Sequence, residues 1–410
     1  YCIMIILVLN CGSSSLKYQV LDMKSDNEFS LLAKGLVERI GMEVGAIVHK
    51  VPGKENYKVE RPIANHTEGV QSVLNILTDP DLGVLKSLSE IDAVGHRLVH
   101  GGETFSGSVL IDDLVIEKVK ECSDLAPLHN PANLLGVYAV TELMPNTPQV
   151  GVFDTAFHQT MPSYAYMYAI PYEYYDKYKI RRYGFHGTSH RFVSKRACEI
   201  TGMELDNSKI ITCHLGNGSS ITAIKNGKSI DTSMGFTPVE GLMMGTRSGS
   251  VDAGVITYIQ EKEKLDATAI NNILNKKSGM QGVSQLSSDN RDIQAGAVAG
   301  NQKAILSQRM LSYSIIKHIG SYVAAMDGVD MIVFTGGIGE NDYQTRARVA
   351  NSLNYLGVDF NEEKNSQTIG NDAIITYPSS KVKIAVIATN EELVIAQDTM
   401  HIVNELKQSK

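Results

Sequence analysis

The chain has 410 residues and a net charge of −7, and its composition is 43% hydrophobic and 20% charged. This length favours two domains of an ordinary globular protein, and an acidic chain without a basic block lacks the charge pattern of a nucleic-acid-binding or membrane-surface protein. The five cysteines are scattered and form no Cys-x-x-Cys pair, which argues against disulfides and zinc and favours a reducing, cytoplasmic location.

The N-terminal segment 3–9 is an apolar run that predicts a buried strand and is too short to span a bilayer. It has neither the basic start nor the cleavage site of a signal peptide, so we expect the native chain to begin at Met4, with residues 1–3 added before it. The run ends in the polar loop 10–15, and alternation over 16–20 predicts the second arm of a hairpin. Glycine and serine at the tip let backbone N–H groups surround phosphate oxygens, and Lys17 adds a charged donor. Taken alone, the same pattern also fits an ordinary turn.

The next elements are strands and a helix. The range 37–59 is strand-like with glycine-containing breaks, and 67–77 has helical spacing. Residues 91–94 predict a strand that leads into the run from His96 to Gly102. The first half therefore alternates strand and helix, as α/β proteins do.

A helix and a strand close the first half. Asn130 and Pro131 have the residue types of a helix cap and first turn, and they predict a helix through Leu143. The short apolar strand 150–153 then ends at Asp154. We place the domain boundary at this point.

The second half contains a second strand-turn-strand unit like that around the loop 10–15. His214 to Ser220 follows the apolar pair Ile210-Ile211 and precedes alternation over 221–224, as the loop 10–15 does. Two strand-turn-strand units predict a duplicated domain in which both loops face one nucleotide in a cleft. Chance similarity of two common turns is the alternative.

Further elements complete an α/β pattern. A helix is predicted over 189–200, and Asn226-Gly227 has the sequence of a type I′ hairpin turn. The buried strand 331–334 opens onto the run from Thr335 to Asn341, and a last strand over 382–388 precedes a terminal helix to about Leu406.

The standard nucleotide motifs are absent. Gly227-Lys228-Ser229 resembles the end of a P-loop, but Thr222 stands where its first glycine would be. Gly337-Ile338-Gly339 lacks the third glycine of a dinucleotide fingerprint, because Asp342 occupies that position. Gly336-Gly337 still permits close backbone approach at a strand end, although a tight turn would have the same sequence.

Three cationic side chains stand beside glycine-containing turns, namely Arg97, His186 and Arg247. Together they could neutralise a phosphoryl group in transfer, although each alone is often a solvated or structural residue. The pairs His96/His100 and His186/His190 are spaced i, i+4 and invite a metal interpretation, which we disfavour because neither pair has the Glu of a His-Glu-x-x-His motif.

Three oxygen-bearing side chains fit a magnesium ion, which is bound through few protein groups plus phosphates. Asn10, Asp154 and Glu391 all stand at predicted strand ends. Glu391 would also suit the first turn of the last helix, and Asp154 could cap a turn.

The ordered set of motifs closely resembles the acetate kinase family. It comprises the runs 10–17, 96–102, 128–131, 153–158, 182–190, 214–220, 245–249 and 336–341, which span nearly the whole chain. The resemblance implies an α/β fold of two duplicated ribonuclease-H-like domains, as in actin-like ATPases, around a nucleotide cleft. The N-terminal domain would be 1–152 plus 386–410, and the C-terminal domain, 153–385, would bind nucleotide and form a homodimer.

The implied reaction is reversible transfer of the ATP γ-phosphoryl group to acetate, giving ADP and acetyl phosphate, with Mg²⁺ that Mn²⁺ can replace. Kinases for propionate or butyrate, and an ATPase module without an acid substrate, are the alternatives. The set Arg97, Val99 and His186 argues against the module.

The resemblance also implies roles for individual residues. The magnesium site would be Asn10 and Glu391, the catalytic group would be Asp154, His186, Arg247 and Arg97, and Arg97 would hold the acetate carboxylate. The methyl group would sit among Val99, Leu128, Phe185 and Pro238. ATP would contact Lys17, His214, Leu215, Gly216, Asn217, Gly218, Asp289, Asn290, Arg291, Gly337, Ile338, Gly339, Glu340 and Asn341.

The family assigns Asp154 as an active-site acid or base, and elementary chemistry qualifies this role. A carboxylic acid with a pKa of about 4–5 is already ionised at neutral pH and needs no general base. The harder step is bringing an anionic carboxylate to an anionic phosphate. We therefore expect Asp154 to position metal or substrate, and catalysis to rest on in-line positioning and charge neutralisation.

Overall fold

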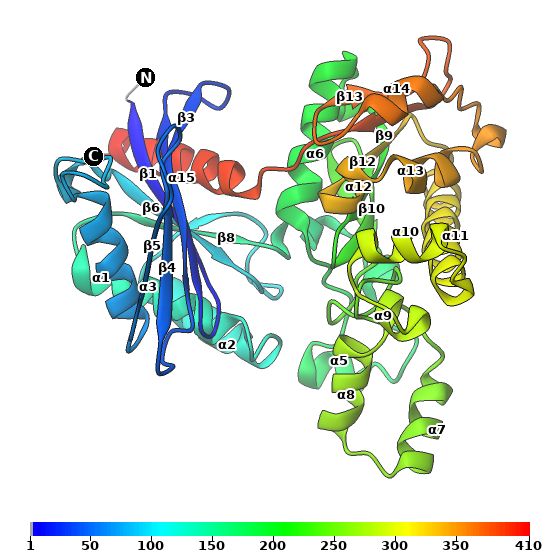
Figure 1. Cartoon of the computed structure of the whole chain (residues 1–410), viewed down its shortest axis with the longest axis horizontal. Helices are drawn as coiled ribbons and strands as arrows, with labels where there is room; N and C mark the ends of the chain where they lie inside the picture. The colour runs from blue at the N-terminus through cyan, green and yellow to red at the C-terminus, as the bar shows by residue number, and fades with distance from the viewer. Residues whose placement is uncertain (1–2) are drawn as a thin grey trace. The chain divides into compact units, whose positions relative to one another are not determined.

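The computed structural model describes residues 3–410, so Tyr1 and Cys2, the first residues of the expected N-terminal addition, lie outside the described residues. The chain forms two compact units, residues 1–157 with 390–410 and residues 158–389, and each contains one sheet with helices on it (Figure 1). The first is called unit 1 and the second unit 2. The sequence-based domain limits, 152 and 385, and the roles attached to them stay predictions.

Unit 1 has an eight-stranded sheet in the order β5-β4-β3-β2-β1-β6-β8-β7. Its strands β1 and β2 form the predicted hairpin, with Asn10 paired to Lys17, and β6 and β8 continue the sheet parallel to β1. The strand bounds are β1 Met4–Cys11, β2 Leu16–Met23, β3 Phe29–Glu38, β4 Gly45–Lys50, β5 Tyr57–Arg61, β6 Ala93–Leu98, β7 Val109–Leu110 and β8 Gln149–Phe153.

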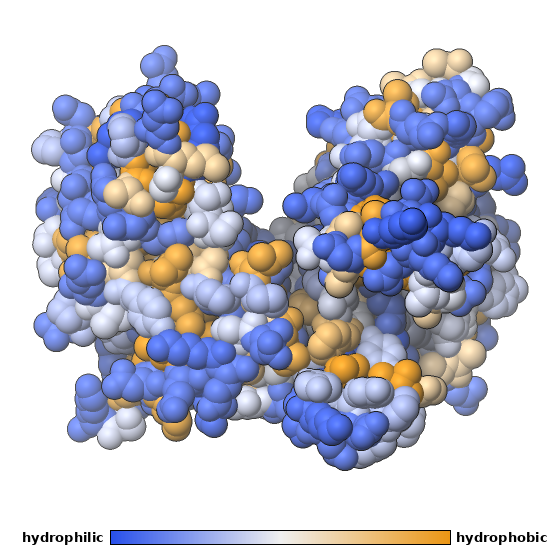
Figure 2. Space-filling view, turned by 90° about the horizontal axis from the view of Figure 1, so that it is seen from below, coloured by the Kyte–Doolittle hydropathy of each residue, from blue (hydrophilic) through white to orange (hydrophobic). Residues whose placement is uncertain are grey.

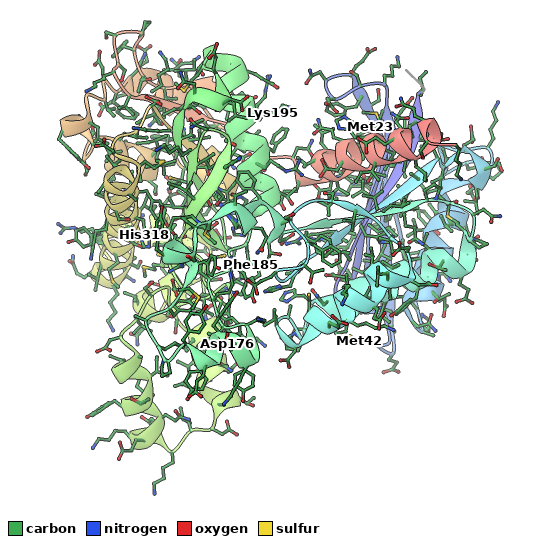
Figure 3. The ribbon with its side chains drawn as sticks, turned by 180° about the vertical axis from the view of Figure 1, so that it is seen from behind. Met23, Met42, Asp176, Phe185, Lys195 and His318 are labelled. Atoms are coloured by element: carbon green, nitrogen blue, oxygen red, sulfur yellow. The ribbon has the colours of Figure 1, made fainter. Side chains whose placement is uncertain are left out.

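Both faces of this sheet are covered by helices, which explains why its central strands are almost wholly apolar. α15 lies on one face and α1 and α3 lie on the other (Figure 1). A Cβ on Gly95 would come within 2.7 Å of Ile395 on α15, and Met23, at the end of β2, lies beside the same helix (Figure 3). The helices of unit 1 are α1 His66–Leu77, η1 Leu88–Glu90, α2 Asp113–Glu121, η2 Cys122–Asp124, α3 Asn130–Leu143 and α15 Glu391–Gln408, while η3 Ala156–Thr160 begins in unit 1 and ends in unit 2.

Unit 2 has a six-stranded sheet in the order β11-β10-β9-β12-β14-β13. Three antiparallel strands, β11, β10 and β9, are followed by the parallel strands β12 and β14, which repeats the order β3-β2-β1-β6-β8 of unit 1. The repeated topology confirms the predicted duplication. The strand bounds are β9 Lys209–Leu215, β10 Ser219–Lys225, β11 Lys228–Thr232, β12 Met331–Thr335, β13 Ala373–Ile374 and β14 Lys383–Val386.

Two helices of unit 2, α6 and α11, pack against this sheet. α6 carries Lys195, and the long α11 carries His318 (Figure 3). The bounds are α4 Ser163–Tyr166, α5 Glu173–Tyr178, α6 Gly187–Thr201, η4 Leu205–Asn207, α7 Ala253–Glu263, α8 Ala267–Lys276, α9 Gly279–Ser284, α10 Asn290–Val298, α11 Gln302–Met326, α12 Gly336–Asn341, α13 Tyr343–Ala350, η5 Asn354–Leu356 and α14 Glu362–Gln367.

The structure confirms some predictions of local structure and corrects one. The helix 130–143 and the hairpin at Asn226-Gly227 are confirmed, and both turn residues have the positive φ of a type I′ turn, 52° and 79°. Asn130, however, is not the cap: His129 precedes the first turn, and the Asn130 side chain bonds to the His100 backbone instead. The prediction was wrong because tertiary partners took the side chain that a local cap would use.

Within residues 3–410, no helix is both long enough and apolar enough to cross a membrane. On the face drawn in Figure 2, hydrophilic and hydrophobic residues are interspersed.

Candidate active site

Three parallel strands of unit 1 end at the same edge of its sheet and bring polar residues together there. Leu9 of β1 pairs with His96 of β6, and Arg97 of β6 pairs with Val152 of β8. Asn10, Arg97 and Asp154 therefore stand at the carboxyl ends of neighbouring parallel strands, where α/β sheets bind ligands.

Arg97 and Asp154 form a bidentate ion pair. Arg97 Nε donates to Asp154 Oδ1 at 3.0 Å, and Nη2 donates to Oδ2 at 2.6 Å. The Asp154 carboxylate raises the pKa of Arg97, and Glu391 and Glu392 add to this effect. The guanidinium expected to hold the acetate carboxylate is thus paired with Asp154 and oriented by it, which fits a positioning role for that carboxylate.

Glu391 begins α15 near this pair. Burial raises the pKa of Glu391 to about 7; Arg97 acts in the opposite direction, and Asp154 and Glu392 add smaller contributions that raise it. A carboxyl with this pKa is partly protonated at neutral pH. Binding of a cation would favour its ionised form, as expected for a carboxylate metal ligand.

The first hairpin tip presents groups without internal partners. Among residues 3–410, neither the Asn10 amide nor the Lys17 ammonium has a hydrogen-bond or ion-pair partner, so both remain available to a ligand. The turn is closed by Gly12 N–H donating to the Ser15 carbonyl at 2.9 Å, and the Gly12 carbonyl lies 2.7 Å from His66 Nε2. Nowhere in the described range do three or more His, Cys, Asp or Glu side chains gather as a protein-only metal cage. Asn10 and Glu391 would therefore hold a cation only together with phosphate oxygens and water.

Two asparagines of α3 hold the segment after β6, and the sequence did not reveal them. Asn133 accepts from Val99 N–H at 3.0 Å and donates to the Cys11 carbonyl at 2.8 Å, so it joins the ends of β6 and β1. Asn130 bonds both the N–H and the carbonyl of His100. Their spacing gives no signal, since the partners lie up to 122 residues away.

Unit 2 contains a pocket of about 630 Å³ at the ends of β9 and β12. Eight of the residues expected to hold ATP line it, namely Gly216, Asn217, Asp289, Asn290, Arg291, Gly337, Ile338 and Asn341. His214, Leu215, Gly218, Gly339 and Glu340 belong to the same turns but are not part of its lining. The other lining residues were not among those expected to contact ATP, although Ser219 and Gly245 lie in two of the motif runs. They are Ser219, Met243, Met244, Gly245, Met280, Ser288, Gln294, Leu311 and Asp342.

Two glycine turns form one end of the pocket. Gly336 has a φ of +80°, and a Cβ there would come within 2.6 Å of the Leu215 carbonyl, so only glycine fits. In the hairpin, Gly216 N–H donates to the Gly218 carbonyl at 3.1 Å. The methionines and Leu311 supply an apolar wall, and the combination suits a nucleotide, which has an apolar base and anionic phosphates.

Polar contacts, some buried and some exposed, fix the rim of this pocket. Asn290 donates to Asp342 Oδ2 at 2.9 Å and so ties α10 to α13. Arg291 pairs with Asp289, which lowers the pKa of that exposed carboxyl to about 2. The fully buried Arg346 donates to the Gly339 carbonyl at 2.9 Å and anchors α12 from behind, although nothing in the sequence distinguished it from a surface arginine.

Arg247 is a partly buried cation without a carboxylate partner in the described part of the chain. Its Nη1 donates to the Pro238 carbonyl at 3.1 Å, and a Cβ on Gly218 would lie 3.3 Å from the same nitrogen. Burial without a counterion lowers the pKa of Arg247. A desolvated guanidinium beside the glycine-containing turn at Gly218 can bind an anion.

His186 stands immediately before α6 in a left-handed conformation, with a φ of 56°. Such a backbone costs about 1–3 kcal/mol in a non-glycine residue, and strain of this kind is concentrated at functional sites. The His186 ring stacks on His214 at 4.1 Å, and its Nδ1 lies 2.9 Å from Ser220 Oγ. Both ring nitrogens of His190 are bonded to hydroxyls, so the i, i+4 pair does not form a metal site.

The residues expected to surround the acetate methyl group differ in exposure. Val99 and Phe185 are buried, Pro238 is half-buried, and Leu128 is 79% exposed. Phe185 lies just before α6 (Figure 3).

The comparisons decide the family. The model of the acetokinase family matches residues 5–397. The chain belongs to this family. The acetate kinase of Carboxydothermus hydrogenoformans is 58% identical over 398 residues, which cover 97% of this chain and 99% of that protein. The crystal structure of Porphyromonas gingivalis acetate kinase has a TM-score of 0.95 at 53% identity and covers 98% of this chain and 100% of its own. A propionate kinase from Francisella tularensis has a TM-score of 0.88 at 43% identity, with 97% and 100% covered.

Membership of the acetokinase family confirms the resemblance seen in the motifs and the predicted fold of two duplicated α/β domains of the actin-like ATPase type. An acetokinase is a phosphotransferase with a carboxyl group as acceptor, and it uses ATP with a divalent metal. The roles of individual site residues stay predictions.

Proposed function

We propose that this acetokinase transfers the γ-phosphoryl group of ATP reversibly to acetate, giving ADP and acetyl phosphate in one in-line step. The observation that carries the proposal is the unpaired, desolvated Arg247 beside Gly218 and the nucleotide pocket. Its charge is available to the phosphoryl group in transit. Acetate as the acceptor is supported by the acetate kinases among its relatives.

We assign the metal as Mg²⁺, with Mn²⁺ as a substitute, and its protein ligands as Asn10 and Glu391. The support is chemical. The Asn10 amide oxygen has no partner within residues 3–410, and the Glu391 carboxyl has a pKa raised to about 7. Oxygen ligands of this kind suit a hard cation that keeps several waters. When bound, the metal neutralises phosphate charge.

The chain's own residues would then divide the remaining work. The acetate carboxylate is ionised at neutral pH and attacks without a base, and Arg97, oriented by Asp154, attracts it. Arg247 and His186 stabilise charge on the phosphoryl group. This scheme requires the loops at Gly12 and Gly218 to face one nucleotide, which stays a prediction.

Formation of acyl hydroxamate from ATP, acid and hydroxylamine tests the proposal. Acetate should give the highest kcat/KM in a series from formate to butyrate, and omission of the divalent metal should abolish product. Hydrolysis of ATP without formation of hydroxamate would identify an ATPase module. A higher kcat/KM for propionate or butyrate than for acetate would identify a kinase for longer acids.

We propose a homodimer formed through unit 2, with a second copy of this chain as the partner. The support is the exposed apolar side of α11, where Leu306, Met310 and Tyr313 are 50%, 41% and 62% exposed at i, i+4 and i+7 positions. Light scattering should give twice the mass of the chain, and Tyr313→Glu should give the monomer. A dimer that persists in Tyr313→Glu, Met310→Glu would reject this surface.

A cytoplasmic location is also proposed, on the cysteine chemistry. Cys11, Cys122, Cys198 and Cys213 are buried free thiols, and burial raises the pKa of Cys122 and Cys198 to about 11. Free thiols are usual in a reducing compartment. Fractionation of the source cells with a compartment marker tests it.

A further inference from the structure

A buried serine of unit 2 touches two histidine rings. Ser220, on β10, is 0% exposed, and its Oγ lies 2.9 Å from His186 Nδ1 and 2.7 Å from His190 Nε2. On the other side of His190, Nδ1 lies 2.6 Å from Thr212 Oγ1 of β9. The four side chains form one continuous row from β9 to His186, the residue that precedes α6.

The hydrogen atoms of this row can run in either of two directions; if Ser220 instead accepted from both rings, its own buried hydrogen would have no acceptor in the row. His190 is fully buried, which lowers its pKa well below the usual value, so its ring is neutral and carries one N–H. In one direction Thr212 donates to His190, His190 donates to Ser220, and Ser220 donates to His186 Nδ1. In the reverse direction His186 donates to Ser220, Ser220 to His190, and His190 to Thr212.

The Thr212 hydroxyl distinguishes the two directions. It is 0% exposed, and His190 Nδ1 is its only hydrogen-bond partner among residues 3–410. In the reverse direction its hydrogen would be buried without an acceptor, which is costly, whereas in the forward direction every hydrogen in the row has an acceptor. The forward direction is therefore favoured.

We propose that Ser220 is a positioning residue that donates to His186 Nδ1 and thereby holds neutral His186 as the tautomer with its hydrogen on Nε2. The Nε2–H is then a fixed donor for an anionic oxygen, and the ring does not have to gain a proton to serve. Its place in catalysis rests on the proposed function, whereas the tautomer itself does not.

The surrounding groups are consistent with a row that sets a tautomer. The titratable side chains that face these rings are His158 and His214, whose Nδ1 atoms lie 2.8 Å from Ser229 Oγ and Ser189 Oγ. A hydroxyl is the smallest side chain that can bridge both rings.

The tautomer can be measured on the unaltered protein by nitrogen-15 NMR of histidine-labelled enzyme, with His186 assigned from the signal lost in His186→Gln. At a pH where the ring is neutral, the proton-bearing nitrogen should be Nε2. Hydrogen on Nδ1, or equal populations of the two forms, overturns the proposal whatever the enzyme's activity. The hydroxamate assay decides the proposed function separately.

Ser220→Ala tests the consequence, with Ser229→Ala as the matched control. Ser229 is also 0% exposed and bonds a buried histidine, His158, but it does not touch His186. Ser220→Ala should lose the Nε2–H preference and lower kcat about tenfold, the order expected for one orienting hydrogen bond, with both KM values changed less than about twofold. Equal losses in both variants would mean a structural role only. If Ser220→Ala does not fold, the spectrum of the unaltered protein still decides.

Discussion

Removal of the Arg247 guanidinium is the sharpest test of how the charge of the phosphoryl group is handled. Arg247 has no carboxylate neighbour in the described chain, and it donates only to the uncharged Pro238 carbonyl and Met244 sulfur, so its full charge remains available. At a separation of about 4 Å and an effective dielectric constant of about 20, one unit charge contributes about 4 kcal/mol. Because each 1.4 kcal/mol is about tenfold, Arg247→Ala should lower kcat by about 10³-fold.

The loss should appear in turnover and not in nucleotide binding. Its proposed partner is charge that develops during transfer, so kcat and kcat/KM should fall together while the Kd of ATP changes less than about threefold. The hydroxamate assay gives the first quantities and calorimetric titration gives the second. Arg247→Lys, which keeps the charge but loses the planar fork, should be intermediate.

Two controls make the result interpretable. Arg39→Ala removes an exposed arginine of unit 1, outside the nucleotide pocket and the proposed dimer surface, and should leave both measurements unchanged. The Tm of Arg247→Ala should not fall, because the variant removes a buried charge that the folded protein does not pair. A loss in kcat below about tenfold, or a Kd for ATP that rises as much as kcat falls, would refute the reasoning.

Three other predictions concern unit 1. Asp154→Asn removes the ion-pair partner of Arg97, so kcat should fall and its dependence on magnesium concentration should change. Loss of one limb of the pH–rate profile with unchanged magnesium dependence would instead identify Asp154 as a general base. Val99→Ala enlarges the expected methyl site and should raise the relative kcat/KM for propionate about tenfold, an assignment that fails if butyrate is already preferred by the unaltered enzyme. Glu391, with its pKa raised to about 7, binds more protons in the folded than in the unfolded state, so the stability of metal-free protein should fall as pH rises from about 4.5 to 7. Melting curves in EDTA across that range should show this loss, and Glu391→Gln should remove its share of it.

Much of this protein was readable from local patterns. Apolar runs such as 331–334 predict buried strands because parallel strands covered on both faces need no polar residues. The loops at Gly12 and Gly218 form a repeated pattern in the sequence, since each follows an apolar run and precedes an alternating one. The strand order repeated in the two sheets confirms the duplication that those loops predicted.

The partners of the side chains could not be predicted in the same way. Arg97 pairs with Asp154 across 57 residues, Asn133 bonds Cys11 across 122, and the Thr212–His190–Ser220–His186 row joins two strands to the start of a helix. Each contact depends on which strands become neighbours and in which register, and a one-residue shift would turn every side chain to the opposite face. Periodicity along the chain determines the type of each element, but hydrogen bonds between distant side chains are determined only when the elements pack.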